Sequence, residues 1–342
     1  MRLFAFFILS LCLPYTSLAC QDSIPDKSIF EDLQFDEDVA VTIITNLDSI
    51  INFRRRTTYQ PASFSYHNKD GDLITQKIKI RPRGKYRRRV CDFPSLKLNF
   101  SKKKLKAMDM SKYDEYKLVT HCLDDEIISN ENIRREYLIY KLFNILSDKS
   151  FKVQLLTITY QDQDNPAYKI KRSGFLIEDE GQFEDRLSLK VMEEPKLPMD
   201  SFDLEQYNFV ALFQYMIGNV DWRATPYAKN IKVIKLPDTI AYQVVPYDFD
   251  FSGLVNVSYL RLAEHLNQKS ARQRIFLGTI SDSSDLHDLF DYYKSKKKTL
   301  LDFIADFDLL SKSSRRNIKK YIASFYDDIT DGEVATKENL SK

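Results

Sequence analysis

Hydrophobic and polar residues alternate along much of the chain between residues 39 and 180. The clearest case is residues 73–83, where Ile74, Ile78 and Ile80 fall on one face and basic side chains fall on the other. A period of two is typical of a strand with one buried face. Short strands with tight connections predict an antiparallel sheet. The other strands that we expect in this sheet cover residues 95–100, 116–121, 151–160 and 168–178.

Helical periodicity interrupts the strands once and then dominates the second half of the chain. Residues 130–146 carry apolar side chains on two faces, and Glu136 lies within one of the apolar stripes, so we expect a broadly buried helix. Over residues 209–216, apolar side chains recur at helical spacing, and Gly218 is placed to end that helix. A hairpin over residues 230–251 comes next, and amphipathic helices follow it.

These patterns divide the chain into a strand-rich half and a helix-rich half, which predicts an α+β fold class. The division falls in a proline-containing stretch near residues 190–200. The segments that we expect are a signal peptide (1–19), a tether (20–38), a strand-rich lobe (39–195), a helix-rich lobe (196–330) and a polar tail (331–342).

The start of the chain has the layout of a secretion signal. Arg2 precedes an apolar run from Leu3 to Leu13, Pro14 ends the run, and Ser17-Leu18-Ala19 supplies the small residues that a signal peptidase recognises. The run is shorter than the roughly 20 apolar residues that a membrane-spanning helix needs. We therefore expect an exported protein, located in the periplasm, in the outer membrane or outside the cell.

The cysteines fit this expectation. Cys20 stands at the cleavage point, so two outcomes stay open: lipidation of Cys20, which would attach the protein to a membrane, or ordinary cleavage and release. Cys91 precedes one expected strand and Cys122 ends another, so antiparallel pairing of these strands would bring their sulfur atoms together. We predict a Cys91–Cys122 disulfide that forms after export.

Four side chains that could bind a cation surround the expected hairpin. Asp221 follows the end of the preceding helix, Asn230 opens the first strand, and Asp248 and Asp250 lie in the sequence VPYDFDFSG. On one strand these two carboxylates would project from the same face about 7 Å apart. They would repel each other unless a proton or a cation such as Mg²⁺ or Mn²⁺ lies between them. The alternative is a strand end whose Asp side chains cap backbone amides.

Basic residues gather in the other half of the chain. Residues 81–85 carry three cations around Gly84, residues 87–89 are all Arg, and Lys97 stands on the outward face of a strand. Each of these taken alone is typical of a solvated face. Together with the acidic hairpin, they predict a cleft for a metal-bound polyphosphate.

The stretch from Gly218 to Gly253 contains GNVDWRATPYAKNIKVI and VPYDFDFSG, and it resembles the Asp, Asn and DxD core of the spore-coat protein H (CotH) kinase-like family. Upstream, IRPRGKYRRRV, FPSLKLNF and RSGFLIEDEG resemble that family's Arg-Gly element, Lys-bearing strand and glycine-aromatic-Glu strand, in the same order. The resemblance extends from about Ile80 to Gly253 and is closest to exported bacterial members. The chain departs from the family at Lys229, where members commonly carry His, and it contains no G-x-G-x-x-G loop.

The resemblance implies a two-lobed, atypical protein-kinase-like fold, with an antiparallel sheet and one helix in the N-lobe and a mostly helical C-lobe that carries a catalytic β-hairpin. It also implies ATP as substrate, Mg²⁺ or Mn²⁺ as cofactor and transfer of the γ-phosphoryl group to an exported protein. Asp221 would orient the acceptor hydroxyl, Asn230 and Asp248 would hold the metal, and Asp250 is a second candidate ligand. The nucleotide-binding residues that it implies are Arg83 and Lys97, with Glu136 or Glu178 paired to Lys97.

Two other functions stay open. The chain could be a non-catalytic, kinase-like binding or assembly protein of the cell envelope, which a lack of metal-dependent nucleotide binding would favour. It could also be a carboxylate-dependent hydrolase, which we disfavour because Asp248 and Asp250 share one short strand instead of flanking a substrate. The net charge of +2 points to no nucleic-acid partner, and the four histidines lie outside the motif, which disfavours a zinc or Ser-His enzyme.

Overall fold

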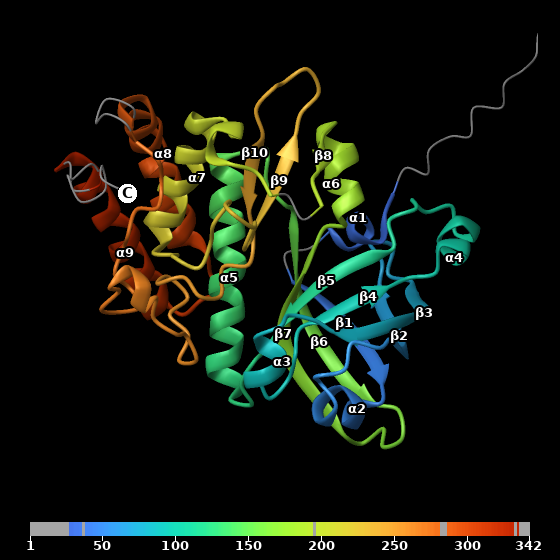
Figure 1. Cartoon of the computed structure of the whole chain (residues 1–342). Helices are drawn as coiled ribbons and strands as arrows, with labels where there is room; N and C mark the ends of the chain where they lie inside the picture. Colours follow the sequence, from blue (N-terminus) through green and yellow to red (C-terminus); the bar gives the residue numbers. More distant parts are fainter. Residues whose placement is uncertain (1–26, 36–37, 194–195, 281–285, 332–333, 335–342) are drawn as a thin grey trace, which may run out of the picture.

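Seven strands close into a barrel on one side of the molecule (Figure 1). The structure is a computed structural model that describes residues 27–35, 38–193, 196–280, 286–331 and 334. Around the barrel the strands follow the order β1-β2-β3-β4-β5-β7-β6. Their bounds are β1 (Asp38–Thr45), β2 (Gln60–His67), β3 (Leu73–Pro82), β4 (Leu96–Asn99), β5 (Glu115–Thr120), β6 (Val153–Asp162) and β7 (Lys169–Ile177).

One parallel pairing closes the barrel. β1 pairs antiparallel with β2 on one side and parallel with β6 on the other, from Asp38 opposite Leu155 to Thr45 opposite Asp162. The expected N-lobe, an antiparallel sheet of a two-lobed kinase-like fold, is therefore wrong, because the fold is a closed mixed barrel with helices packed beside it. Alternation along a strand shows which face is buried, but it does not fix which two edge strands meet.

Alternating apolar side chains fill the barrel, as the sequence pattern predicts. Ile78 and Ile80 of β3 are buried inside it, whereas the neighbouring Lys77 and Lys79 are exposed. The short helix α1 (Ile29–Leu33) packs onto the same core, and its Phe30 is fully buried. Part of the stretch predicted as a tether is thus folded against the barrel. The short helices in the barrel connections are α2 (Leu47–Asn52), α3 (Arg87–Val90) and α4 (Lys102–Ala107).

The long helix α5 (Glu126–Leu146) stands between the barrel and the C-terminal helices (Figure 1). It packs against β7 on one side and against α8 on the other. The Asp125 side chain accepts a hydrogen bond from the N–H of Ile128 and so starts the helix a turn before the predicted residue 130. The other elements here are α6 (Glu180–Leu187), β8 (Lys190–Val191), a 3₁₀ turn (Met199–Ser201), α7 (Leu204–Ile217), a second 3₁₀ turn (Glu264–Leu266), α8 (His287–Asp306) and α9 (Lys312–Thr330).

The predicted hairpin is present but shorter than expected. β9 (Ile231–Lys235) and β10 (Gln243–Pro246) pair antiparallel and join β8 in a three-stranded sheet. Asp248 has a left-handed φ of +64°, which no regular strand contains, so the chain leaves the strand direction there. Asp248 and Asp250 consequently lie in the loop after β10 and do not share a strand face.

Several predictions concern residues that the structure does not describe. The signal peptide, Cys20 and most of the polar tail lie outside the described residues. Within the described ranges, no helix has both the length and the apolar character that crossing a membrane requires.

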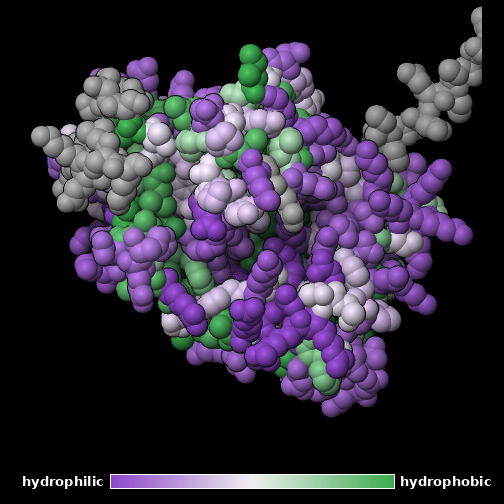
Figure 2. Space-filling view, in the orientation of Figure 1, coloured by the Kyte–Doolittle hydropathy of each residue, from purple (hydrophilic) through white to green (hydrophobic). Residues whose placement is uncertain are grey.

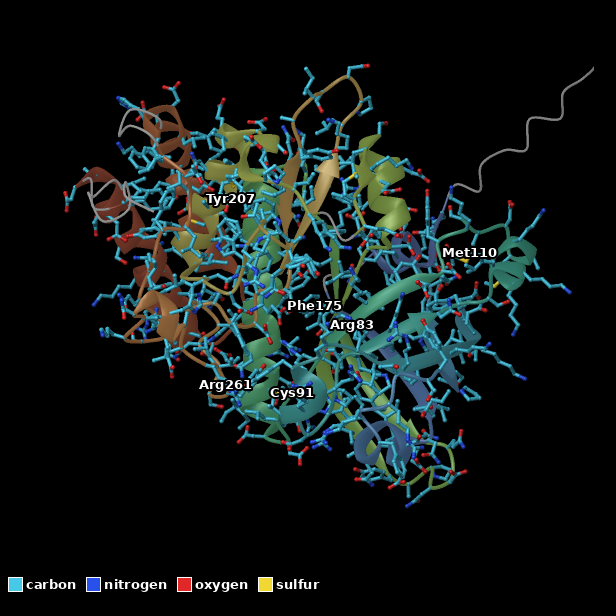
Figure 3. The ribbon with its side chains drawn as sticks, viewed as in Figure 1. Arg83, Cys91, Met110, Phe175, Tyr207 and Arg261 are labelled. Carbon is cyan, nitrogen blue, oxygen red and sulfur yellow. A yellow bond between two sulfur atoms is a disulfide. The ribbon has the colours of Figure 1, made fainter. Side chains whose placement is uncertain are left out.

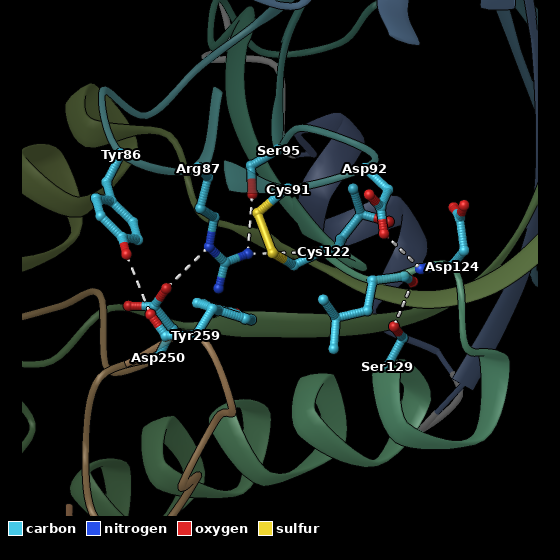
Figure 4. The surroundings of a disulfide bond; sticks show 12 residues. Tyr86, Arg87, Cys91, Asp92, Ser95, Cys122, Asp124, Ser129, Asp250 and Tyr259 are labelled. Atoms are coloured by element: carbon cyan, nitrogen blue, oxygen red, sulfur yellow. Dashed lines mark hydrogen bonds and ion pairs between the residues drawn. A yellow bond between two sulfur atoms is a disulfide. The ribbon is translucent and has the colours of Figure 1, made fainter. Parts of the chain in front are cut away.

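The predicted disulfide between Cys91 and Cys122 is confirmed (Figure 4). The strands β4 and β5 pair antiparallel, with Leu96 opposite Leu118, and this pairing brings the two cysteines to the same end of the barrel. Their Cα atoms are 4.5 Å apart, and the N–H of Asp92 donates a hydrogen bond to the carbonyl of Cys122. The bond fixes α3 against the end of β5.

We expect the double substitution Cys91→Ser and Cys122→Ser to lower the free energy of unfolding by about 3–4 kcal/mol, because the disulfide spans 31 residues and restricts the unfolded chain. Urea unfolding of the oxidised wild type and of the variant measures this difference. In the native wild-type protein, a thiol-alkylating reagent should label neither cysteine until a reductant is added. Labelling of both without reductant would contradict the pairing.

Candidate functional site

A cavity of about 450 Å³ lies between the end of the barrel and the loop after β10. Asp221, Asn230, Asp248, Asp250 and Arg83 all line it, so the structure brings the acidic hairpin and the Arg-Gly element together. The other lining residues are Gly84, Lys85, Tyr86, Arg87, Ser95, Val119, Ala228, Lys229, Tyr247 and Phe251. Figure 3 shows Arg83 at the centre of the molecule, between the barrel and the C-terminal half.

Hydrogen bonds hold Asp221 and Asn230 together although eight residues lie between them in the sequence. Gly218, with a φ of +66°, ends α7, as predicted, and turns the chain toward Asp221. The Nδ2 of Asn230 donates to the backbone carbonyl of Asp221 at 2.7 Å and to its Oδ2 at 2.9 Å. The other carboxylate oxygen, Oδ1, accepts a hydrogen bond from the ammonium group of Lys229. Both oxygens of Asp221 are therefore engaged.

The backbone holds Asp248 in place while its carboxylate stays available. The N–H of Asp248 donates to the hydroxyl oxygen of Tyr140 on α5 at 2.9 Å, and the N–H of Tyr247 donates to the carbonyl of Asn230 at 3.1 Å. Asp248 and Asn230 both have a left-handed φ, which Asp and Asn tolerate better than most residues. The Asp248 carboxylate is half-buried and makes no hydrogen bond or ion pair with any described residue.

Arg87 ties the site to the rest of the molecule (Figure 4). Its Nε donates to Oδ2 of Asp250 and its Nη2 to Oε2 of Glu136, both at 3.0 Å. Its Nη1 donates to Oγ of Ser95 at 3.1 Å and to the carbonyl of Thr120 at 3.2 Å. The sequence grouped Arg87 with the two Arg residues that follow it, but its side chain is only 10% exposed.

The two carboxyl groups that share Arg87 are electrostatically strained. Burial raises the pKa of Glu136 and of Asp250, and the Arg87 guanidinium opposes both shifts. One guanidinium can neutralise only one carboxylate, and the buried Oε1 of Glu136 has no hydrogen-bond partner among the described residues. The pair of carboxyl groups, Glu136 and Asp250, therefore retains a proton in a pH range where exposed carboxyl groups have lost theirs.

Three of the predicted nucleotide-binding residues, Lys97, Glu136 and Glu178, do not line the cavity, and Glu136 is connected to it only through Arg87. Lys97 does not line the cavity, and its ammonium group pairs with Glu115 on the neighbouring strand β5. Glu178 pairs with Arg186 at 2.6 Å and accepts a hydrogen bond from the N–H of Lys152. The predicted pairing of Lys97 with Glu136 or Glu178 is thus replaced by separate partners for each of the three residues.

Lys117 is the cation that sequence reasoning missed. It lies directly opposite Lys97 in the β4–β5 pair, and its Nζ is 5.0 Å from the ring centre of Tyr247 in the cavity wall. Glu180 pairs with both Lys117, at 3.6 Å, and Lys232, at 2.5 Å. Burial, and then the positive charges of Lys232 and Arg83, lower the pKa of Lys117 to about 8. The only sequence signal was its position between Tyr116 and Leu118 in the expected strand.

The donor atoms around Asp248 fit a hard divalent cation. Asp248 supplies an unengaged carboxylate, and Asn230 donates through Nδ2, which leaves its Oδ1 to face a cation. Mg²⁺ in proteins often takes one or two carboxylates and leaves its other positions to water and phosphate. The described ranges contain no group of three or more His, Cys, Asp or Glu side chains that could hold a metal ion. A site here would therefore need substrate phosphates to complete it.

Comparisons with known proteins give little guidance. No family model matches the chain, and no curated protein matches it. Among solved structures, the chain is similar to the Helicobacter pylori proinflammatory kinase CtkA, with 14% sequence identity, a TM-score of 0.36 and coverage of 66% of this chain and 90% of that chain. This similarity is too weak to assign a fold or a chemistry.

We expect Arg87→Met to lower the free energy of unfolding by about 3–5 kcal/mol, because it leaves Glu136 and Asp250 buried without their shared cation. Arg89→Met, two residues later on α3 and exposed, is the matched control and should change it by no more than about 0.5 kcal/mol. Urea unfolding measures both. Equal effects of the two substitutions on the free energy of unfolding would show that the buried ion pairs of Arg87 stabilise the protein no more than an exposed Arg does.

Proposed function

We propose that the protein is a metal-dependent phosphotransferase that moves the γ-phosphoryl group of ATP to a hydroxyl group of an exported protein, and that it is related to the CotH kinase-like family. The observation that carries this proposal is that Asp221, Asn230 and Asp248 line the same cavity as the cations Arg83 and Lys229. Phosphoryl transfer needs positioning and neutralisation of charge more than covalent chemistry, and these side chains supply both.

Each side chain has a distinct role in this proposal. Asp221 accepts a hydrogen bond from the acceptor hydroxyl and takes up its proton, and Asn230 and Lys229 hold the Asp221 carboxylate in position. Asp248 and the Oδ1 of Asn230 would hold a Mg²⁺ or Mn²⁺ ion, with Asp250 as a further candidate ligand. When bound, the ion would neutralise charge on the transferred phosphate. Arg83 contacts the phosphates.

Lys117 is better placed than Lys97 to contact the phosphates of a nucleotide in the cavity. Lys117 is close enough to Arg83 and Asp248 for their charges to shift its pKa, and both of those residues line the cavity. Neither lysine is among the residues that line the cavity, and each pairs with a glutamate, but Lys117 lies against Tyr247 in the cavity wall. We therefore propose Lys117 as the lysine that faces the phosphates.

Export of the protein also remains a proposal. The Cys91–Cys122 disulfide suits an oxidising compartment, which is where a cleaved signal peptide would deliver the chain. Lipidation of Cys20 would add attachment to a membrane. Mass spectrometry of the mature N-terminus from the native host separates a lipidated Cys20 from a chain that is released by ordinary cleavage.

A non-catalytic binding protein is the second candidate, and one observation favours it. Both carboxylate oxygens of Asp221 are already engaged, by Lys229 and by Asn230, so a hydroxyl group must share an oxygen with one of them. Binding of nucleotide without phosphate transfer to any exported protein would support this second function.

We expect Asp248→Asn to abolish most of the stabilisation that ATP and Mg²⁺ or Mn²⁺ confer together, because the amide removes the negative charge that holds the cation. The substitution keeps a residue type that tolerates the left-handed φ of +64°. In a thermal-shift titration, wild-type protein at ligand concentrations about 100-fold above Kd should gain about 2.7 kcal/mol. The variant should gain less than half of this.

Asp238→Asn is the matched control for this experiment. Asp238 also has a left-handed φ, of +59°, but it is exposed in the β9–β10 turn and does not line the cavity. This variant should respond to ATP and metal as the wild type does. A wild type that shows no metal-dependent shift would overturn the phosphotransferase proposal.

The affinity for ATP should fall as the pH rises through about 8, because the pKa of Lys117 in the free protein is about 8 and only its charged form attracts phosphate. Lys117→Arg keeps the charge and should remove most of this pH dependence, whereas Lys97→Arg should leave it unchanged. Isothermal titration between about pH 6.5 and 9.5 measures these trends. A loss of binding in Lys97→Met but not in Lys117→Met would restore Lys97 as the phosphate contact.

A further inference from the structure

A group of cations borders the mouth of the cavity, and we call it the cationic rim. Its members are Arg55, Arg83, Lys85, Arg88, Arg89 and Arg261. Contacts connect Arg55, Arg88 and Arg261 to the stretch that carries Arg83 and Lys85. The guanidinium of Arg88 donates to the carbonyl groups of Gly84 and Arg55, and the guanidinium of Arg261 lies 5.5 Å from the ring centre of Tyr86, which begins α3.

The rim has an unbalanced positive charge. None of its six members forms an ion pair with a carboxylate of the described chain, whereas the neighbouring Arg87 pairs with both Glu136 and Asp250. Arg55, Lys85, Arg89 and Arg261 are exposed. Figure 2 shows strongly hydrophilic side chains over the lower centre of this face, and Figure 3 labels Arg83 and Arg261 on opposite sides of α3. Such a concentration of one sign attracts a partner of the opposite sign.

The rim is continuous with the candidate site. Arg83 and Lys85 line the cavity itself, beside Asp221 and Asp248. From these two cations the positive surface extends outward over α3 to the loop after α2. A chain that places one residue in the cavity would therefore lay its neighbouring residues on the rim. The partner must be neutral where it meets the three Asp residues and negative on either side.

We infer that the cationic rim binds acidic protein segments, and that the acceptor is a Ser, Thr or Tyr hydroxyl flanked by Asp and Glu residues. This inference rests on the proposed function. In the reaction, the hydroxyl oxygen forms a bond to the γ-phosphorus of ATP while the bond from that phosphorus to the β–γ bridging oxygen breaks. ADP leaves with that oxygen, and the hydroxyl proton passes to Asp221.

The shape and charge of the site favour a peptide over other polyanions. A flat membrane surface would reach the exposed outer cations but not Arg83, which is half-buried in the cavity wall. A nucleic acid carries a phosphate at every nucleotide and would place negative charge against Asp221, Asp248 and Asp250. It would also lack a stacking platform at Tyr86, whose ring already packs edge-on against Phe251. A peptide can present a single neutral hydroxyl residue at that point.

The test is binding of a fluorescein-labelled peptide that carries one Ser flanked by Glu residues, measured by fluorescence anisotropy with the full exported chain and without metal or nucleotide. The triple substitution Lys85→Glu, Arg89→Glu and Arg261→Glu should weaken binding about tenfold or more. Raising the salt concentration from about 0.05 M to about 0.3 M should weaken wild-type binding. A peptide with Lys in place of Glu should not bind.

The matched control is Lys103→Glu, Lys104→Glu and Lys106→Glu, which makes the same charge change on exposed residues of α4 that form no ion pair in the described chain. It should bind the acidic peptide as the wild type does. Equal weakening in both variants would overturn the inference. If the charge reversal prevents folding, the same three rim positions are changed to Gln, with thermal unfolding as the check, and weaker binding is still expected.

Two further arms separate this inference from its competitors and from the proposed function. Rim-dependent binding of vesicles containing phosphatidylglycerol, or of oligo-dT, in preference to the peptide would overturn it. If ATP and metal bind in an Asp248-dependent manner but the acidic peptide does not bind, the inference alone fails. If the peptide binds to the rim but no nucleotide binds, the phosphotransferase proposal fails and the acidic partner remains.

Discussion

One buried guanidinium connects the parts of this protein that would otherwise be independent. Arg87 lies on α3 and donates to Asp250 in the loop after β10, to Glu136 on α5, to Ser95 before β4 and to the last residue of β5. A charge removed from water is costly unless it is paired and hydrogen-bonded, so these partners hold one another in place. The disulfide anchors α3 from the other side, because Cys91 follows α3 directly.

The helix α5 carries this constraint into the candidate site. Glu136 and Tyr140 are one turn apart on α5, and they reach the two Asp residues of the β10 loop by different routes. Glu136 acts on Asp250 through Arg87, whereas Tyr140 accepts a hydrogen bond from the N–H of Asp248 directly. Packing of Tyr140 against Phe249 fixes the residue between them. The loop thus keeps Asp248 facing the cavity without using its carboxylate.

The contrast between Asp248 and Asp250 follows from these contacts. Asp250 is buried and shares its cation, so it is less available to bind a metal than the sequence alone implied. Asp248 is half-buried with a free carboxylate, and Asn230 beside it has its amide oxygen available. The candidate site therefore depends on one Asp, one Asn and the substrate, with Asp221 held separately by Asn230 and Lys229.

The sequence by itself determined the local features of this protein. Alternation located five barrel strands, helical spacing located α5 and α7, and the motif residues Asp221, Asn230 and Asp248 do line one cavity. The Cys91–Cys122 pairing was also predictable, because it requires only that two neighbouring strands be antiparallel. These features depend on residues that are close in sequence or on adjacent strands.

Only the tertiary structure decided the rest, because the interactions responsible join distant parts of the chain. The parallel β1–β6 pairing closes the barrel, and no periodicity specifies it. Arg87, Arg88 and Arg89 are identical in sequence, yet burial separates the first from the other two. Lys97 and Lys117 are opposite one another on adjacent strands, yet Lys97 pairs with Glu115, whereas Lys117 pairs with Glu180 and lies against Tyr247 in the cavity wall.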